Sequence, residues 1–223
     1  MTIKEKFTVK PIKRYETHDW FLNKHYAKRV PSITYCYGLY DINKVLQGVI
    51  SFGSPASKPL VVGAFKGKYQ EDFLELNRLC VNDNLEKNVL SFFVSQSIKL
   101  LKKPKVIVSY ADTSQSHHGY IYQATNWIYT GLSDKRTEWR MRGNNKHSKT
   151  ICEQYTLEER QKDKNKFYIT ERPRKHRYFY LLGNKKEKKE MKQNLQYKIE
   201  LYPKGENKKY DASYSPSIQG ILF

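Results

Sequence analysis

Residues 118–131 read HGYIYQATNWIYTG, and a change of periodicity inside them decides how this part of the chain folds. Residues 119–125 have the spacing of a short helix, and residues 127–130 have the composition of a strand. Asn126 stands between them, and asparagine tolerates the left-handed backbone conformation that ends many helices. The stretch therefore predicts a helix that leads directly into a strand, with Tyr122 on the helix in reach of the opening of a sheet.

The segments before this stretch alternate in the same way. Strand-like runs occupy residues 7–12, 32–42, 45–53, 73–81 and 105–110. Helical spacing occurs at 15–29 and 89–101, and the Pro, Gly and Ser of 54–67 indicate a long loop. Because crossover helices join strands that lie parallel in one sheet, this order predicts an α/β fold with a mixed central sheet flanked by helices.

The charge of the chain points to its partner. The 223 residues carry 41 Lys and Arg against 22 Asp and Glu, a formal net charge of +19. Such a surplus favours a polyanion, because basic side chains release counterions from phosphate backbones. Residues 1–140 hold the apolar periodicity and are expected to form the core. Residues 141–223 are expected to be a basic C-terminal extension that completes the sheet and contacts DNA.

Two further features concern the compartment. No apolar run is long enough to cross a membrane, and no secretory signal precedes the first strand. The three cysteines are far apart, odd in number and without metal-binding spacing, which argues against a disulfide framework. We expect a protein of the reducing cytoplasm that does not associate with membranes.

Arg78 and Asp112 are polar residues in segments that are otherwise apolar. Arg78 interrupts FLELNRLCV (73–81), and a buried arginine requires a partner or a ligand. Glu75 is the nearest candidate partner, but strand alternation places residues three apart on opposite faces. Asp112 follows the strand expected at 105–110, and open α/β sheets bind ligands beyond the carboxyl ends of their strands. Asp112 is therefore a candidate proton acceptor or metal ligand, with a turn or helix cap as the alternative.

Two basic clusters are candidates for phosphate contacts. One lies in the helix expected at 15–29, and the other opens the run RPRKHRYFYLLG (172–183). Their members are Lys24, Lys28, Arg29, Arg172, Arg174, Lys175 and Arg177. In the second cluster, basic residues are interleaved with Tyr178, Phe179 and Tyr180, which suits stacking on bases. The alternative is a solvated strand edge.

Several blocks of the sequence resemble known families. The segment with Tyr122, Asn126 and Trp127 resembles the last helix and strand of the GNAT acyltransferase superfamily. A closer resemblance is to the phage Mom-type DNA adenine-modification proteins, which are GNAT-like, over roughly residues 20–182. The blocks that carry it are NKHYAKRVPSITYCYGLY (23–40), VISFGSPAS (49–57), ELNRLCV (75–81), SFFVSQSIKLL (91–101) and VSYADTSQSHHGYIYQATNWIYTG (108–131).

This resemblance implies an enzyme that modifies the exocyclic N6 amine of adenine in double-stranded DNA. The product would be of the carbamoylmethyl (acetamido) type, which protects phage DNA from host restriction. The resemblance implies Arg78, Asp112, Tyr122 and His25 as catalytic residues, with Tyr122 as a general acid. His25 is a candidate base near neutral pH.

The resemblance also implies a donor, which would be acetyl-CoA or a related acyl donor, with Ser91 facing it. The loop NDNLEKNVLS (82–91) lacks the glycines that would hold a CoA diphosphate at a helix N-terminus. A metal ion held by His25, Asp112 and Tyr122 stays open. Two other functions also stay open: acyl transfer to another amine, and DNA binding without catalysis by a degenerate acyltransferase fold. The sequence does not determine the oligomeric state.

Overall fold

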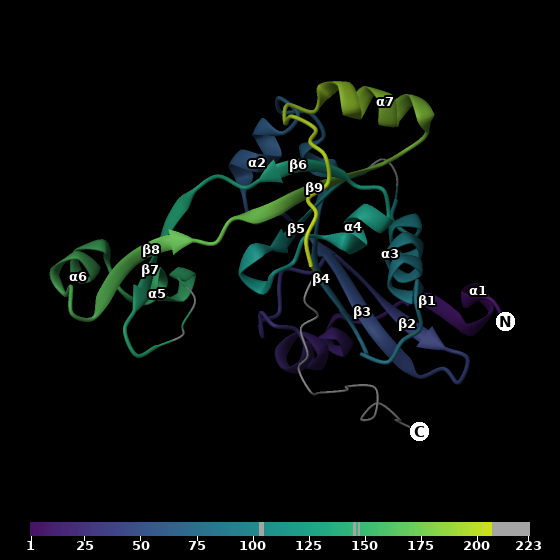
Figure 1. The fold of residues 1–223 in the computed structure, drawn as a ribbon, viewed down its shortest axis with the longest axis horizontal. Coiled ribbons are helices and arrows are strands. Elements are labelled where there is room, and N and C mark those ends of the chain that lie inside the picture. Colours follow the sequence, from purple (N-terminus) through teal and green to yellow (C-terminus); the bar gives the residue numbers. More distant parts are fainter. Residues whose placement is uncertain (103–104, 145, 147, 207–223) are drawn as a thin grey trace.

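The computed structural model describes residues 1–102, 105–144, 146 and 148–206 of the chain (Figure 1). Its centre is a seven-stranded mixed sheet with the strand order β1-β2-β3-β4-β5-β9-β6, and β7 and β8 form a separate two-stranded sheet. The strands are β1 (Phe7–Pro11), β2 (Tyr35–Asp41), β3 (Leu46–Gly53), β4 (Phe73–Val81), β5 (Lys105–Asp112), β6 (Ile128–Leu132), β7 (Arg136–Met141), β8 (Phe167–Arg172) and β9 (Lys175–Leu182).

Helices cover both faces of the large sheet. The α-helices are α1 (Ile3–Lys6), α2 (Lys58–Gly63), α3 (Val89–Lys99), α4 (Tyr120–Ala124), α5 (Ser148–Gln154), α6 (Leu157–Lys162) and α7 (Lys185–Asn194). The shorter helices are η1 (Arg14–Thr17), η2 (Trp20–Lys24), η3 (Gln70–Asp72) and η4 (Thr113–Gln115). The predicted α/β class with a mixed, helix-flanked sheet is therefore confirmed. None of the helices among the described residues has both the length and the apolar content needed to span a bilayer.

The core is divided by the sheet into two main layers. On one face, Phe93 and Val94 of α3 and Tyr122 of α4 pack among the side chains of the central strands. On the other face, Leu60 of α2 and Met191 of α7 join a second apolar cluster. The predicted loop at 54–67 was wrong in part, because it contains α2: the Ser57 hydroxyl caps that helix by accepting from Leu60 N–H at 3.3 Å.

The predicted junction at Asn126 is confirmed. Asn126 has φ 60°, and the N–H of Trp127 donates to the carbonyl of Tyr122 at 3.0 Å while that of Asn126 donates to Gln123 at 3.1 Å. This pair of bonds is the Schellman arrangement that satisfies the last carbonyls of a helix. It fixes α4 against the sheet. In contrast, the helix expected at 15–29 is reduced to η1 and η2 and ends at His25, where the backbone is extended.

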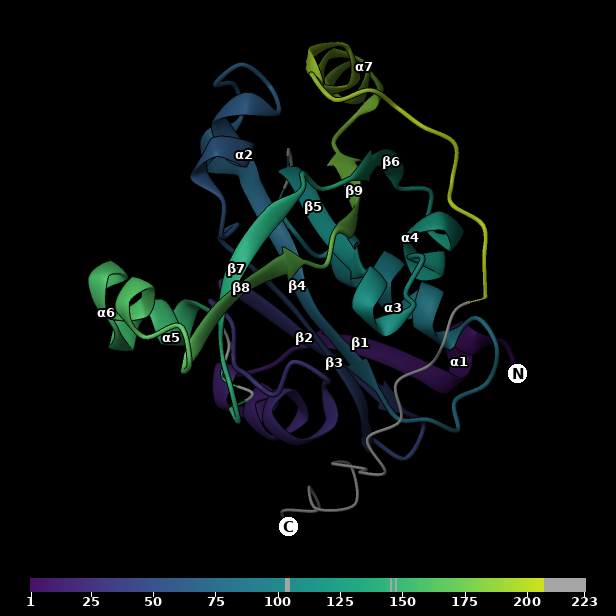
Figure 2. The same ribbon diagram turned by 60° about the vertical axis from the view of Figure 1, so that its left-hand side comes forward.

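Strand β9 lies between β5 and β6 and is antiparallel to both. Tyr178 and Phe179 are fully buried there. The expected base stacking on these two rings is therefore wrong, and so is the alternative of a solvated edge. Between β6 and β9 the chain leaves the sheet, forms the β7–β8 hairpin with α5 and α6, and returns; this hairpin projects from the body (Figure 2). A boundary at residue 140 would fall inside β7, and residues 207–223 lie outside the described part.

Strands β4 and β5 separate soon after they pair. They are parallel partners at Phe73–Glu75 and Val106–Val108, and no further pairing between them occurs among the described residues. On its other side β4 pairs with β3, where Ser51 lies opposite Arg78 but Phe52 lies opposite Leu76. The extra residue in β4 is a bulge, and a bulge interrupts the alternation of side chains. The sheet therefore opens between β4 and β5.

Candidate functional site

A cavity of about 530 Å³ lies at this opening. Its walls come from β4, the end of β5, the N-terminal turn of α3, helix α4, the segment after η2 and the first residue of β9. Small-molecule sites in proteins usually have volumes of about 300–1,000 Å³ and combine apolar walls with a few polar groups. The cavity also fits the rule that open α/β sheets bind ligands beyond the carboxyl ends of their strands. It is the candidate active site.

Arg78 lines this cavity without a carboxylate partner among the described residues. Its Nη1 donates to the carbonyl of Asn77 at 2.6 Å and its Nε to the carbonyl of Arg29 at 3.3 Å. Burial lowers the pKa of the Arg78 guanidinium, since the charged form is partly desolvated. Main-chain carbonyls hold the group in place but do not neutralise it. Arg78 can therefore bind an anionic part of a substrate, as a planar guanidinium does well.

Glu75 also lines the cavity, and sequence reasoning assigned it no function. Strict alternation would have placed the Glu75 side chain on the other face of β4 from Arg78. The bulge in β4 interrupts this alternation, and both side chains line the cavity. One Glu75 oxygen accepts from the N–H of Ala56 at 3.3 Å. Burial raises the pKa of the Glu75 carboxyl, against the opposing effects of Ala56, Arg78 and Lys175. A carboxylate whose pKa is raised toward neutrality is a suitable proton acceptor.

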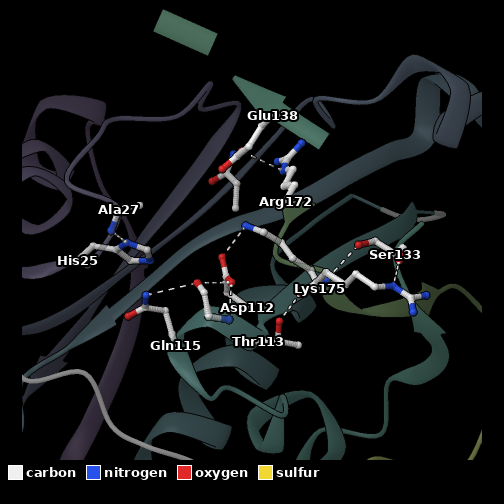
Figure 3. A network of polar contacts seen from close by, with 12 residues as sticks. His25, Ala27, Asp112, Thr113, Gln115, Ser133, Glu138, Arg172 and Lys175 are labelled. Atoms are coloured by element: carbon white, nitrogen blue, oxygen red, sulfur yellow. Dashed lines mark hydrogen bonds and ion pairs between the residues drawn. The ribbon is translucent and has the colours of Figure 1, made fainter. Parts of the chain in front are cut away.

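Asp112 is held by an ion pair. It ends β5 opposite Lys175, and its Oδ2 lies 2.8 Å from the Lys175 ammonium, as Figure 3 shows. Its Oδ1 accepts from the N–H and the hydroxyl of Ser114 at 3.0 and 2.7 Å. Burial raises the pKa of the Asp112 carboxyl, but the hydrogen bonds from Lys175 and Ser114 outweigh burial and hold it below its ordinary value. Of the two carboxyls, Glu75 has the raised pKa and Asp112 the lowered one, and Asp112 holds the Lys175 ammonium in place.

Tyr122 reaches the cavity from α4 and is part of a hydroxyl chain. Its hydroxyl lies 2.7 Å from Ser109 Oγ, which itself donates to the carbonyl of Leu76 at 2.8 Å. Ser109 has one hydroxyl proton, so both bonds form when Tyr122 donates to Ser109. Burial raises the pKa of the Tyr122 hydroxyl, which therefore stays protonated. Tyr122 can deliver this proton to a substrate by turning its O–H from Ser109 into the cavity.

His25 is a hydrogen-bond donor in this geometry. Burial, followed by the charges of Arg78, His117 and Lys175, lowers the pKa of His25 from 6.5 to about 3. The neutral ring accepts from the N–H of Ala27 at its Nδ1, at 3.1 Å, so the remaining proton is on Nε2. The expectation that His25 is a base near neutral pH is corrected by this pKa.

The loop before α3 is where the resemblance places the donor. Ser91 lines the cavity, and its hydroxyl donates to the carbonyl of Asn88 at 2.9 Å. Asp83 lines the cavity as well and pairs with Lys24 at 2.6 Å, while Glu86 of the same loop pairs with Lys6 at 3.0 Å. A carboxylate in the wall and the absence of glycine do not fit a CoA diphosphate. The residues fit a smaller anionic group at Arg78.

A metal site is not evident from the described residues, which contain no group of three His, Cys, Asp or Glu side chains suited to a metal ion. The oxygens of Asp112 and the Nδ1 of His25 already have the partners given above.

The seven basic residues predicted to contact phosphate are divided by the structure. Lys28, Arg29 and Arg172 are exposed. Arg177 is buried, donates to Thr130, and lies with its guanidinium carbon 3.5 Å from the centre of the Tyr197 ring. The others, Lys24, Arg174 and Lys175, are bound to Asp83, to the carbonyls of Leu132 and Ser133, and to Asp112. These four side chains bind groups within the protein. The prediction of phosphate contact is therefore kept for the three exposed residues.

Comparisons with known proteins give one family. Residues 6–204 match the model of the Mom protein family. A curated relative, the methylcarbamoylase Mom of Escherichia phage Mu, is 29% identical over 136 residues, which are 57% of this chain and 54% of that protein. The chain therefore spans about half the length of the curated relative that it matches.

Solved structures are matched at low sequence identity. The spermidine/spermine N-acetyltransferase SpeG of Vibrio cholerae, in complex with manganese ions, has a TM-score of 0.45 and 11% identity; the match covers 86% of this chain and 99% of that one. The protein yncA of Salmonella typhimurium, described as a putative acetyltransferase with its cofactor acetyl-CoA, has a TM-score of 0.45 and 9% identity; the match covers 80% of this chain and 95% of that one. The family assignment rests on the sequence match.

Proposed function

The chain belongs to the Mom protein family, and we propose that it is a phage-type transferase that modifies DNA on the exocyclic N6 amine of adenine. The modification would be of the carbamoylmethyl (acetamido) type and would protect DNA from restriction. The protein would act in the cytoplasm of a bacterial host. The observation that carries this proposal is the cavity at the sheet opening, where Arg78, Glu75 and Tyr122 meet.

The chemistry asks three things of the protein. The adenine amine is a weak nucleophile, so it must be held close to the donor in a site with little water. It must lose a proton as the new bond to carbon forms, and Glu75 is the group placed to take it. The leaving group of the donor must be stabilised, and Tyr122 holds the proton for that step.

Arg78 and His25 would hold the donor. Arg78 offers a positive charge that lacks an ion-pair partner among the described residues, and His25 offers an N–H. Attack on the carbonyl carbon of an acyl donor would give an N6-acyl adenine, so a carbamoylmethyl product requires a related donor whose electrophilic carbon is the methylene next to a carboxamide and which carries a leaving group on that carbon. We place Ser91 at its edge, since the hydroxyl lies at the start of α3. The structure favours a donor with a compact anion over one that needs a diphosphate cradle.

Nucleoside analysis tests this function. DNA from bacteria that express the chain is digested, and the nucleosides are separated and weighed by mass spectrometry. We expect a deoxyadenosine heavier by one carbamoylmethyl group, and we expect Glu75→Gln to remove it while the protein stays soluble. Unmodified deoxyadenosine from cells with abundant folded protein would contradict the proposal. A modified protein or polyamine in the same cells would instead favour acyl transfer to another amine.

A further inference from the structure

A second cavity, of about 290 Å³, lies beside the first. The two share Glu75, Tyr110 and Lys175 in their walls. The second cavity is otherwise bounded by the start of α2, the crossing from β6 to β7, the crossing from β8 to β9, and the side chains of Arg177 and Tyr197. It therefore opens toward the α2 side of the sheet, whereas α3 and α4 line the first cavity. Groups bound in the two cavities would both lie beside Glu75.

Three arginines line the second cavity: Arg177 is buried and bonded to Thr130, and Arg136 and Arg172 are exposed. Arg136 of β7 and Arg172 of β8 are directly opposite each other in the hairpin register, so both side chains lie on the same face. Their side chains are 61% and 46% exposed. The nearest carboxylates, Asp134 and Glu138, are only at 3.9 and 4.0 Å, the outer limit of an ion pair. Like charges directly opposite each other destabilise a hairpin, and a bound anion removes that cost.

The carboxylate of Glu138 is also occupied elsewhere. It accepts from Arg140 Nε at 2.8 Å, a shorter contact than the one to Arg172. Figure 3 shows Arg172 and Glu138 on the side toward which the Lys175 ammonium points. Lys175 in turn is held by Asp112. Positive charge thus gathers above the shared wall. Glu138 and Asp112 already have closer partners, and Asp134 is 80% exposed at 3.9 Å from Arg136.

We propose that this second cavity is the acceptor site, and that it takes the nucleotide whose base is modified, turned out of the duplex; this step rests on the function proposed above. Arg136 and Arg172 would bind the phosphates of the same strand beside that nucleotide, because guanidinium groups bind phosphate with two parallel hydrogen bonds. Tyr110 provides an aromatic side chain for the base. Enzymes that act on a base inside a duplex turn it into a pocket of this kind. The amine then faces Glu75, with the donor beyond it in the first cavity.

The phosphate contacts are tested by salt dependence. The full chain carrying Arg136→Ala and Arg172→Ala is titrated with a fluorescent duplex at several salt concentrations. The control carries Lys4→Ala and Lys10→Ala, which remove the same charge from exposed residues of α1 and of the edge strand β1, outside both cavities. Each lost phosphate contact lowers the slope of log affinity against log salt by about 0.9, so we expect a fall of about 1.8 for the arginine pair. Equal slopes for the two double variants would overturn the proposal.

The cavity itself is tested by filling it. Ala56 is exposed and lines the second cavity, and only its main-chain N–H binds Glu75. We expect Ala56→Trp to reduce the modification rate at least tenfold while duplex affinity changes less than twofold. Val62→Trp, at an exposed residue of α2 that lines neither cavity, is the matched control and should keep its rate. An Ala56→Trp protein that modifies DNA at the wild-type rate would overturn the acceptor site. If the wild type modifies no adenine, the proposed function fails, and the salt slopes still decide whether the arginine pair binds DNA.

Discussion

Replacing Tyr122 by phenylalanine tests whether the Tyr122 hydroxyl serves only the stability of the fold or also the reaction. The change removes the hydroxyl that lies 2.7 Å from Ser109 and leaves the ring in the core. Ser109 keeps its bond to Leu76, so one hydrogen bond is lost. The net value of such a bond is about 1 kcal/mol. For a chain of this size that corresponds to a fall in Tm of about 2–4 °C.

The effect on the reaction should be much larger. If Tyr122 delivers a proton to the leaving group, its loss should slow modification by about 10²–10⁴-fold. The assay is the initial rate at which modified deoxyadenosine accumulates after induction, because steady levels can saturate. Tyr129→Phe is the matched control. The Tyr129 hydroxyl is also buried, 2.8 Å from His176 Nδ1, and lies outside the cavity. We expect the control to lose similar stability and to keep its rate. A Tyr122→Phe rate within about twofold of the control would refute the reasoning.

Three further predictions follow from single contacts. Arg78→Lys keeps the charge but not the planar guanidinium, so it should change the free energy of unfolding by no more than about 1 kcal/mol and weaken donor binding at least tenfold. Arg78→Ala should weaken donor binding as well. It should also lower the free energy of urea unfolding by about 1–3 kcal/mol, because the carbonyls of Asn77 and Arg29 lose their donor. The pKa of His25, faced by Arg78, His117 and Lys175, is about 3 in the fold against 6.5 for a free histidine, so its contribution to stability is complete above pH 6.5 and is lost as the pH falls toward 3. Between pH 7 and pH 5 the wild type should therefore lose about 2 kcal/mol more than His25→Gln, as measured by urea unfolding. Asn126→Ala should lower the free energy of unfolding by about 1 kcal/mol, and Asn126→Gly should not, because only the alanine is strained at φ 60°.

Local patterns predicted most of the fold. The junction at Asn126 could be read from one residue, because a left-handed helix end has a clear preference for Asn or Gly. Helix α2 was overlooked because Ser and Pro were read as loop residues, although Ser before Pro also begins helices. Strand β9 was harder. Its sequence KHRYFYLL mixes basic and aromatic residues, and only its long-range pairing with β5 and β6 shows that it is central.

The candidate site could also be predicted only in part from the sequence. The resemblance implied functional roles for five residues, Arg78, Asp112, Tyr122, His25 and Ser91. All but Asp112 line the first cavity, and Asp112 lies behind its wall, paired with Lys175. Glu75 was overlooked because the alternation rule assumes a regular strand, and nothing in FLELNRLCV marks the bulge. The charge states of the side chains could not be predicted either. Burial and neighbouring charges set the pKa of His25 and of Glu75, and both depend on residues far away in the sequence.

The segment between β6 and β9, which contains β7 and β8, leaves the sheet and returns to it at the same place. The Ser133 N–H donates to the Lys175 carbonyl at 2.8 Å, and the Lys175 N–H donates back to Ser133 Oγ at 2.9 Å. These hydrogen bonds join the two ends of the segment between β6 and β9, so the length of that segment does not affect the pairing of the sheet. Doubling the length of a surface loop costs only about 0.6 kcal/mol in closure entropy. Evolution can therefore lengthen, shorten or exchange this arm while the strands below keep their register. Under the function proposed above, changes in this arm would alter its contacts with DNA and leave the residues of the first cavity in place.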